Sequence, residues 1–303
     1  MTALTIRAGC SRCGAALPAD AAFCPVCGWR NAPSRLPWTH ARYWRGLLAG
    51  YALFVAVGYV LRWTSNTNLL PTELILGSFL VPACFVFFLY ENGSVTQVPL
   101  ATVLSVFLVG GALGVIFAAL LESSLAWLVL VGFVEEACKV AALWWWLRDR
   151  RLRGEGHGLV LGAAAGMGFA ALETMGYGLN ALLSPHGLDL GAMTQTLMQR
   201  ALLSPLGHGT WTAILAATLW REVTAGRSPF GAPVWRSYLA VSVLHSLYDL
   251  TLQSPALSRL AITLPFLQLP VITFGIGLIG LGILRSLLLR LRRTPALRVA
   301  GAG

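Results

Sequence analysis

Seven ionisable side chains interrupt four strongly apolar stretches of this sequence. They are Glu135, Glu136 and Lys139, then Glu173, then His208, and finally His245 and Asp249. Carboxylates can deprotonate water, imidazoles can exchange protons near neutral pH, and both groups can bind Zn2+. These residue types therefore indicate hydrolytic chemistry, provided that the chain brings them together.

The first group lies within FVEEACKVAALWWW, residues 133–146. On a helix, Lys139 would follow Glu135 at i+4 and Glu136 at i+3, so its ammonium could contact both carboxylates. It is the only lysine in a chain with 21 arginines. The arrangement suits a general base, for which Glu136 is the preferred candidate, and a purely structural ion pair is the alternative.

The apolar stretches predict an all-α polytopic membrane protein. Of the 303 residues, 56% are hydrophobic and 11% are charged, with a mean hydropathy of +0.70. Runs of about 20 apolar residues can cross a bilayer. Eight spans are expected, at 44–63, 74–90, 99–121, 125–147, 158–183, 198–220, 236–253 and 262–285. A helical rise of about 1.5 Å per residue places the ionisable groups about 14–22 Å from the cytoplasmic ends, which is a single layer.

The net charge of +10 is explained by topology. With eight spans, the arginine-rich segments before the first span, at 148–153, at 221–236 and after the last span all face one side. The positive-inside rule then places both termini in the cytoplasm and the chain in the cell membrane. The lipid bilayer is an expected partner of the chain, and nucleic acid is not. No cleavable signal peptide is expected, and His157 and His186 are expected to be solvated at the ends of spans or loops.

A cysteine pattern precedes the spans. Cys10, Cys13, Cys24 and Cys27 form two C-x2-C pairs, which can complete the tetrahedral sulfur shell of a structural Zn2+. Disulfides or a redox motif are the alternatives. A reducing location disfavours the disulfides, and two C-x2-C pairs in one short module disfavour a redox motif. The expected organisation is a zinc ribbon at 8–30, a linker at 31–43, a membrane domain at 44–285 with a motif-bearing core at 125–255, and a basic tail at 286–303. The ribbon is expected to contact a cytoplasmic protein.

Four ordered motifs resemble those of the PrsW family of intramembrane proteases. They are EEACK (135–139), FAALE (169–173), HGTWTA (208–213) and HSLYD (245–249). That family is distantly related to the CAAX-processing membrane endopeptidases. The resemblance implies a glutamate-dependent peptidase acting on membrane-anchored proteins, in some members anti-sigma factors. It implies catalytic roles for Glu135, Glu136, Glu173, His208 and His245. Asparagine often follows the third glutamate in the family, whereas Thr174 does so here.

The expected mechanism is peptide hydrolysis by water that a glutamate activates. His208 or His245 would stabilise the oxyanion or protonate the leaving amine, and Asp249 would orient His245 from i+4. A catalytic metal stays open, because Glu173, His208 and His245 are acceptable Zn2+ ligands. Two alternatives are a proton-coupled transporter, since buried Glu, His and Lys also form proton relays, and a membrane scaffold that presents the ribbon.

Overall fold

Helices form over nearly all of the apolar runs. The computed structural model describes residues 6–7, 17–18, 42–92, 98–123, 128–264 and 267–293. Its helices are α1 (Tyr43–Thr64), α2 (Leu70–Asn92), α3 (Leu100–Ser105), α4 (Gly111–Glu122), α5 (Val131–Ala142), α6 (Trp144–Leu147), α7 (Glu155–Leu182), α8 (Leu190–Leu203), α9 (His208–Thr224), α10 (Ala232–Gln253), α11 (Pro255–Ser258) and α12 (Val271–Arg293). A π-helical segment, Val106–Gly110, joins α3 to α4, and short 3-10 turns lie at Thr67–Leu69, Leu128–Leu130 and Ser204–Leu206.

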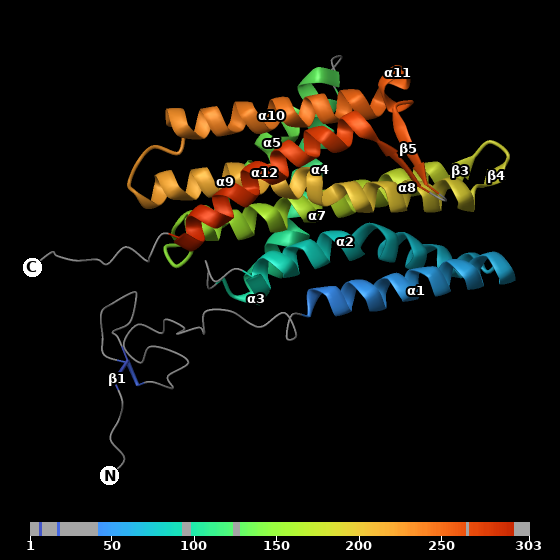
Figure 1. The fold of residues 1–303 in the computed structure, drawn as a ribbon, viewed down its shortest axis with the longest axis horizontal. Helices are drawn as coiled ribbons and strands as arrows, with labels where there is room; N and C mark the ends of the chain where they lie inside the picture. Colours follow the sequence, from blue (N-terminus) through green and yellow to red (C-terminus); the bar gives the residue numbers. More distant parts are fainter. Residues whose placement is uncertain are drawn as a thin grey trace, which may run out of the picture.

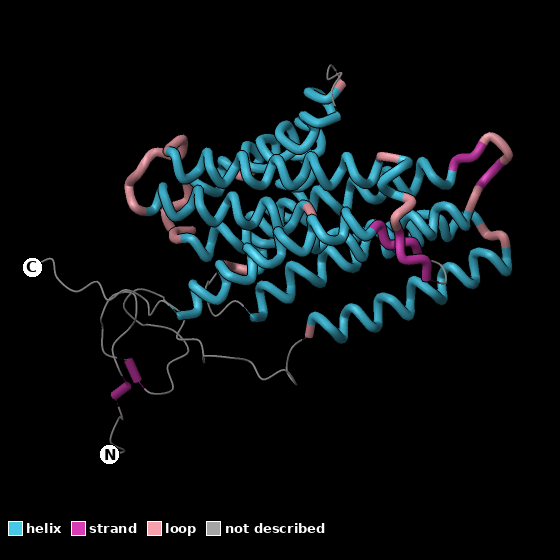
Figure 2. Tube along the Cα trace, turned by 45° about the horizontal axis from the view of Figure 1, so that its top comes forward, coloured by secondary structure: helices cyan, strands magenta, loops and turns pink. Residues whose placement is uncertain are grey.

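Three two-stranded antiparallel sheets complete the described secondary structure. They pair β1 (Ile6–Arg7) with β2 (Leu17–Pro18), β3 (Leu183–Ser184) with β4 (Gly187–Leu188), and β5 (Ala261–Leu264) with β6 (Leu267–Pro270). In the last hairpin, Ala261 is opposite Pro270 and Leu264 is opposite Leu267. Figure 2 shows how small these strands are beside the helices.

The structure confirms an all-α, multi-pass membrane protein. Within the described residues, five helical segments are long and apolar enough to span a bilayer: Tyr43–Thr64, Thr67–Glu91, Leu100–Glu122, Glu155–Leu182 and Val271–Leu291. The total of eight spans stays a prediction.

Three of the expected spans have different bounds in the structure. Over 125–147, α5 begins only at Val131 and ends at Ala142, and the short helix α6 follows it. The helix expected over 198–220 breaks at Ser204–Gly207, because Pro205 lacks a backbone N–H and Gly207 is non-helical with φ −114° and ψ −123°. As a result, α8 and α9 are separate helices. The span expected over 262–285 begins as the β5–β6 hairpin, and its helix, α12, starts only at Val271.

Helix α7 forms the centre of the bundle. In its most apolar 18-residue window 83% of the residues are buried, whereas the corresponding value for α1 is 17%. Figure 1 shows α1 and α2 on one side of α7, and α10 and α12 on the other. An exposed apolar helix such as α1 is suited to face lipid, whereas the central position of α7 keeps its ionisable residues away from lipid.

Glycines on α7 allow α9 to approach it closely. Gly158, Gly162 and Gly166 recur at intervals of four residues and therefore line one face of the helix. A Cβ at Gly162 would lie 2.5 Å from the backbone oxygen of Thr212, and one at Gly166 would lie 2.4 Å from that of His208. Because only a hydrogen fits at these positions, α9 is held with its first residue, His208, against the middle of α7.

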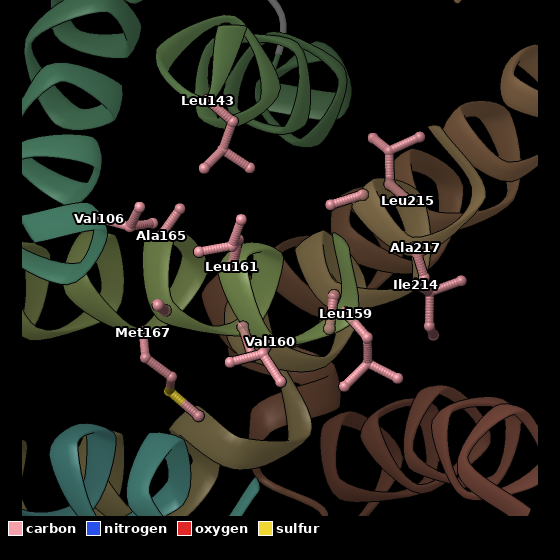
Figure 3. Packing of buried hydrophobic residues seen from close by; sticks show 14 of the residues in the cluster. Val106, Leu143, Leu159, Val160, Leu161, Ala165, Met167, Ile214, Leu215 and Ala217 are labelled. Carbon is pink, nitrogen blue, oxygen red and sulfur yellow. The ribbon is translucent and has the colours of Figure 1, made fainter. Parts of the chain in front are cut away.

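Aliphatic packing fixes the other neighbours of α7. Leu159, Leu161 and Met167 are almost completely buried. Figure 3 shows Leu143, between α5 and α6, pointing toward Leu161, and Val106 of the π-helical segment beside Ala165. Uncharged, close-packed side chains thus hold the residue that follows α5, and the π-helical segment, against α7.

Ion pairs join the helices at one end of the bundle. Glu155, in the first turn of α7, contacts Arg221 of α9 at 3.2 Å and also pairs with Arg290 of α12. In Figure 1 the loop between α9 and α10 and the end of α12 lie at this end, and the loop before α7 is tied to the end of α9 by hydrogen bonds from Gly154 N to Thr224 Oγ1 (2.8 Å) and from Trp220 Nε1 to the backbone oxygen of Leu152 (2.9 Å). The basic loops at 148–153 and 225–231 therefore share one side of the molecule.

Candidate active site

Lys139 lies at the centre of the buried polar cluster. Its Nζ donates to Glu135 Oε2 and to Glu136 Oε1, at 2.9 Å each, and it also lies 2.9 Å from His208 Nδ1. The ring of Phe169 covers the ammonium at 4.1 Å from its centroid. The side chain of Lys139 is completely buried, and a compact ammonium can contact three groups in a space that would not accommodate a guanidinium.

His208 bridges α5 and α7. It is the first residue of α9, where the close contact with Gly166 holds it against α7. Its Nδ1 faces Lys139 and lies 3.6 Å from Glu135 Oε2, while its Nε2 lies 3.1 Å from Glu173 Oε2. Each ring nitrogen of His208 therefore faces a different charged group.

His245 of α10 lies behind the two glutamates. Its Nδ1 is 3.1 Å from Glu136 Oε1, and its Nε2 is 3.5 Å from Glu135 Oε2 and 3.4 Å from Asp249 Oδ2. Its side chain is fully buried, and neither ring nitrogen has a well-aligned hydrogen bond among the described residues. Glu136 is also fully buried, and its second oxygen accepts a hydrogen bond of 2.9 Å from Thr212 Oγ1.

Glu173 is paired with an arginine. Arg200 of α8 donates from Nη2 to Glu173 Oε2 at 2.6 Å and from Nε to Thr174 Oγ1 at 3.3 Å. Its guanidinium also stacks over the ring of Tyr177, 4.0 Å from the centroid. Three neighbouring residues of one α7 face therefore hold the Arg200 head group.

A cavity of about 850 Å³ reaches the cluster. Glu135, Glu173 and His208 line it near the middle of the bundle, together with Arg200 and Asp249. Further out, its lining includes Glu122, Gln253, Arg259 and Pro270, which lie at the ends of helices opposite to the basic loops. Glu136 and His245 are not part of the lining. The cavity has room for several water molecules, so a hydrated substrate could reach Glu135 but not Glu136.

Three of these residues can hold a metal ion. Single ligand atoms of Glu135, His208 and His245 all lie within 4.8 Å of one another, and all three residues are buried. Two ligands of one Zn2+ lie up to about 4 Å apart, because Zn–N and Zn–O bonds are about 2.0–2.2 Å long. The Glu135 Oε2 separations of 3.6 Å and 3.5 Å from the two imidazoles match this requirement. Neither ring nitrogen of His245 has a hydrogen-bond partner among the described residues, so either nitrogen can serve as a metal ligand. The ligand types and their spacing therefore fit zinc, and binding would require the Lys139 ammonium, 2.9 Å from both Glu135 Oε2 and His208 Nδ1, to move off these two atoms.

The structure brings together every ionisable residue that the sequence singled out in the spans. Their chemical roles stay a prediction. The metal-compatible trio includes Glu135, whereas the expected zinc set contained Glu173, which is engaged by Arg200. His157 is buried in the first turn of α7, contrary to the expectation of a solvated residue, while His186 is exposed.

Three residues near the site were missed in the sequence: Thr212, Glu122 and Arg200. Arg200 carried a usable signal, since an arginine at the end of a span opposite to the basic loops departs from the positive-inside rule.

The four ribbon cysteines, and most of the expected ribbon, linker and tail, lie outside the described residues.

Comparisons with known proteins agree with this geometry. A model of the PrsW family of intramembrane metalloproteases matches residues 71–276, and a zinc-ribbon domain model matches residues 10–28. No curated protein and no solved structure matches the chain. The first match covers more than half of the chain and includes the whole buried cluster, and the second includes all four ribbon cysteines, which supports Zn2+ as a cofactor. The chain belongs to the PrsW family of intramembrane metalloproteases and is a multi-pass membrane protein that hydrolyses peptide bonds.

Proposed function

We propose that the protein cleaves membrane-anchored proteins with water that Glu135 activates. One observation carries the proposal: Glu135 is the carboxylate of the metal-compatible trio, and it also lies in the cavity wall, where His208 lines the cavity beside it. Glu136, the base preferred from the sequence, is fully buried and bonded to Lys139 and Thr212. A general base must reach the proton that it removes, so the geometry favours Glu135.

The other residues of the cluster divide into two groups. His208 lines the cavity, and its unprotonated Nδ1 can take up the proton that Glu135 removes from water and pass it to the leaving amine. Lys139 and Glu136 lie behind Glu135, where the ammonium offsets the charge of the two adjacent carboxylates. Without a metal, Asp249, 3.4 Å from His245 Nε2, would face an N–H on that nitrogen and so orient the imidazole.

Glu135, His208 and His245 would hold the metal that the family uses. A Zn2+ bound there would lower the pKa of a coordinated water to about 7 and polarise the scissile carbonyl. Glu135 would then orient the water, and Glu136 would fix His245 through its Nδ1, 3.1 Å away. His208 would in turn be held by Glu173, 3.1 Å from its Nε2.

The substrates proposed are regulatory proteins with a membrane anchor, such as anti-sigma factors. A substrate segment would enter the cavity between the ends of α4, α8 and α10, where Glu122, Gln199 and Gln253 line it. Both termini would lie in the cytoplasm, since the basic loops share one side of the bundle. The ribbon would bind a cytoplasmic protein there.

The test uses the purified full chain in liposomes with a single-span substrate. Replacing Glu135 by Gln should lower kcat by about 10²–10⁴-fold, the range for loss of a general base. The matched control is Glu73→Gln, because Glu73 is equally buried but lies on α2 outside the cluster, and this variant should keep wild-type activity. Full cleavage by Glu135→Gln would refute the proposal. Proton flux without cleavage would indicate the transporter instead.

A further inference from the structure

Arg200 has a place in the site that the family motifs do not assign. It belongs to α8, outside the four motifs, and its side chain is 17% exposed at the cavity wall. It reaches His208 through one intermediate, the Glu173 carboxylate, whose Oε2 lies 2.6 Å from Arg200 Nη2 and 3.1 Å from His208 Nε2. A single oxygen therefore links the guanidinium to the imidazole.

The groups around His208 determine which of its ring nitrogens carries the proton. A carboxylate can only accept a hydrogen bond and an ammonium can only donate one. Nε2 faces the Glu173 carboxylate, so it carries the proton. Nδ1 lies 2.9 Å from Lys139 Nζ, so it is unprotonated and its lone pair accepts a hydrogen bond from the ammonium. Glu135 Oε2 lies 3.6 Å from the same Nδ1, which is thus the nitrogen available to the catalytic cluster.

We propose that Arg200 is a positioning residue. Its guanidinium holds the Glu173 carboxylate, so that His208 keeps its proton on Nε2 and presents the lone pair of Nδ1 to the Lys139 ammonium beside Glu135. The Arg200 guanidinium is itself held in place, because its Nε donates to Thr174 Oγ1 and its face stacks on the ring of Tyr177. Without it, the Glu173 side chain, 21% exposed at the cavity, is free to turn toward water. His208 can then adopt the other tautomer, with its Nδ1 protonated.

The inference rests on the proposed function of His208, but its first test needs no turnover. The full chain is labelled with 15N-histidine, and NMR nitrogen shifts report the tautomer of His208, identified among the five histidines by a His208→Gln variant. The wild type should show protonated Nε2 and bare Nδ1. Arg200→Gln and Glu173→Gln should both show a mixture, and Arg200→Lys should retain part of the wild-type signal.

Kinetics and metal binding extend the test. Loss of a group that orients a metal ligand usually costs about 10–100-fold in activity or affinity, so Arg200→Gln should lower kcat and zinc affinity by that factor with little change in KM. The double variant Arg200→Gln with Glu173→Gln should be no worse than Glu173→Gln alone, since both changes remove one chain of contacts.

Arg62 provides the matched control for a merely structural role. It also tethers α8, through hydrogen bonds from Nη2 to Thr194 Oγ1 (2.5 Å) and to the backbone oxygen of Leu190 (3.3 Å), but among the described residues it makes no hydrogen bond or ion pair with Glu173 or His208. Arg62→Gln should leave the tautomer, kcat and zinc affinity unchanged. An unchanged tautomer in Arg200→Gln, or an equal change in Arg62→Gln, would overturn the proposal. An active Glu135→Gln variant would refute the base but leave the tautomer result intact.

Discussion

Gly166 offers a sharp test of how the fold positions the site, because a single methyl group added there meets the backbone of His208. In Gly166→Ala the new Cβ would lie 2.4 Å from the carbonyl oxygen of His208, 2.8 Å from its carbonyl carbon and 2.9 Å from Thr212 Oγ1. Two of these atoms are backbone, so rotation of a side chain cannot relieve the overlap. The first turn of α9 must move away from α7.

The size of the movement follows from the contact. Real Cβ atoms almost never approach another heavy atom closer than 3.0 Å, so α9 must shift by at least about 0.6 Å at His208. Overpacking of this kind costs about 1–3 kcal/mol, and the better helix propensity of Ala returns up to about 1 kcal/mol. Misplacing a catalytic group by about 1 Å can lower the rate about 10²-fold. We therefore expect a modest loss of stability and a loss of kcat of about 10–100-fold.

The assay compares Gly166→Ala with Gly176→Ala by cleavage of a membrane-anchored substrate and by thermal unfolding in the same detergent. Gly176 lies on the same helix, but a Cβ there would have no neighbour within 4 Å. Gly176→Ala should keep the wild-type kcat and unfold at the same or a slightly higher temperature. Wild-type kcat in a folded Gly166→Ala variant would refute the idea that the contact between α7 and α9 positions His208.

Three further changes probe the cluster. Lys139→Met should destabilise the protein by about 3–5 kcal/mol in thermal unfolding, because it leaves two buried carboxylates without their cation. Adding Glu135→Gln should recover part of this loss, and equal stability of Lys139→Met and wild type would contradict the ion-pair interpretation. Thr212→Val should cost about 1–3 kcal/mol, since Glu136 Oε2 loses its donor, whereas Thr218→Val, which removes a hydrogen bond within α9, should cost less. A chelator should abolish cleavage, and added zinc restore it, in a variant whose ribbon cysteines are all serine; activity that survives chelation would exclude a catalytic metal.

The depth of the site could be predicted from the sequence because helical rise is nearly constant. Counting residues from the span ends placed Glu136, Glu173, His208 and His245 in one layer, and the structure brings these four close together. An error of a few residues in a predicted span end changes the depth of a residue by only a few ångströms, so the residues are still placed in one layer.

The rotation of α5 could not be predicted in the same way. Glu135 and Glu136 are adjacent and point about 100° apart around the helix, and the local sequence favours neither for the cavity side. Their orientation depends on the packing of α5 against α10, where a Cβ at Gly132 would lie 2.6 Å from the backbone nitrogen of Ser246. Such tertiary contacts decide that Glu135 lines the cavity.

Arg200 was missed for a related reason. One helix over 198–220 would have separated it from His208 by more than two turns of the same helix. The break at Ser204–Gly207 lets α8 and α9 follow different directions, so that both residues can contact Glu173. The spacing of Gly158, Gly162 and Gly166 was, by contrast, a readable sign of close helix packing.

The charges of the cluster give an independent reason to expect a divalent ion. If all of its groups are ionised, the cluster has four negative and two positive charges, so two negative charges stay uncompensated. The carboxylates are those of Glu135, Glu136, Glu173 and Asp249, and the cations are Lys139 and Arg200. An uncompensated charge inside a bundle is costly, so the balance must come from two protons or from one divalent cation. Protons on Glu135 would remove its ability to accept one from water. A zinc ion bound by Glu135, His208 and His245 would balance the charge and keep that carboxylate ionised. Lys139 alone neutralises only one of the two adjacent glutamates. The uncompensated negative charge of the buried cluster therefore favours the binding of a divalent cation.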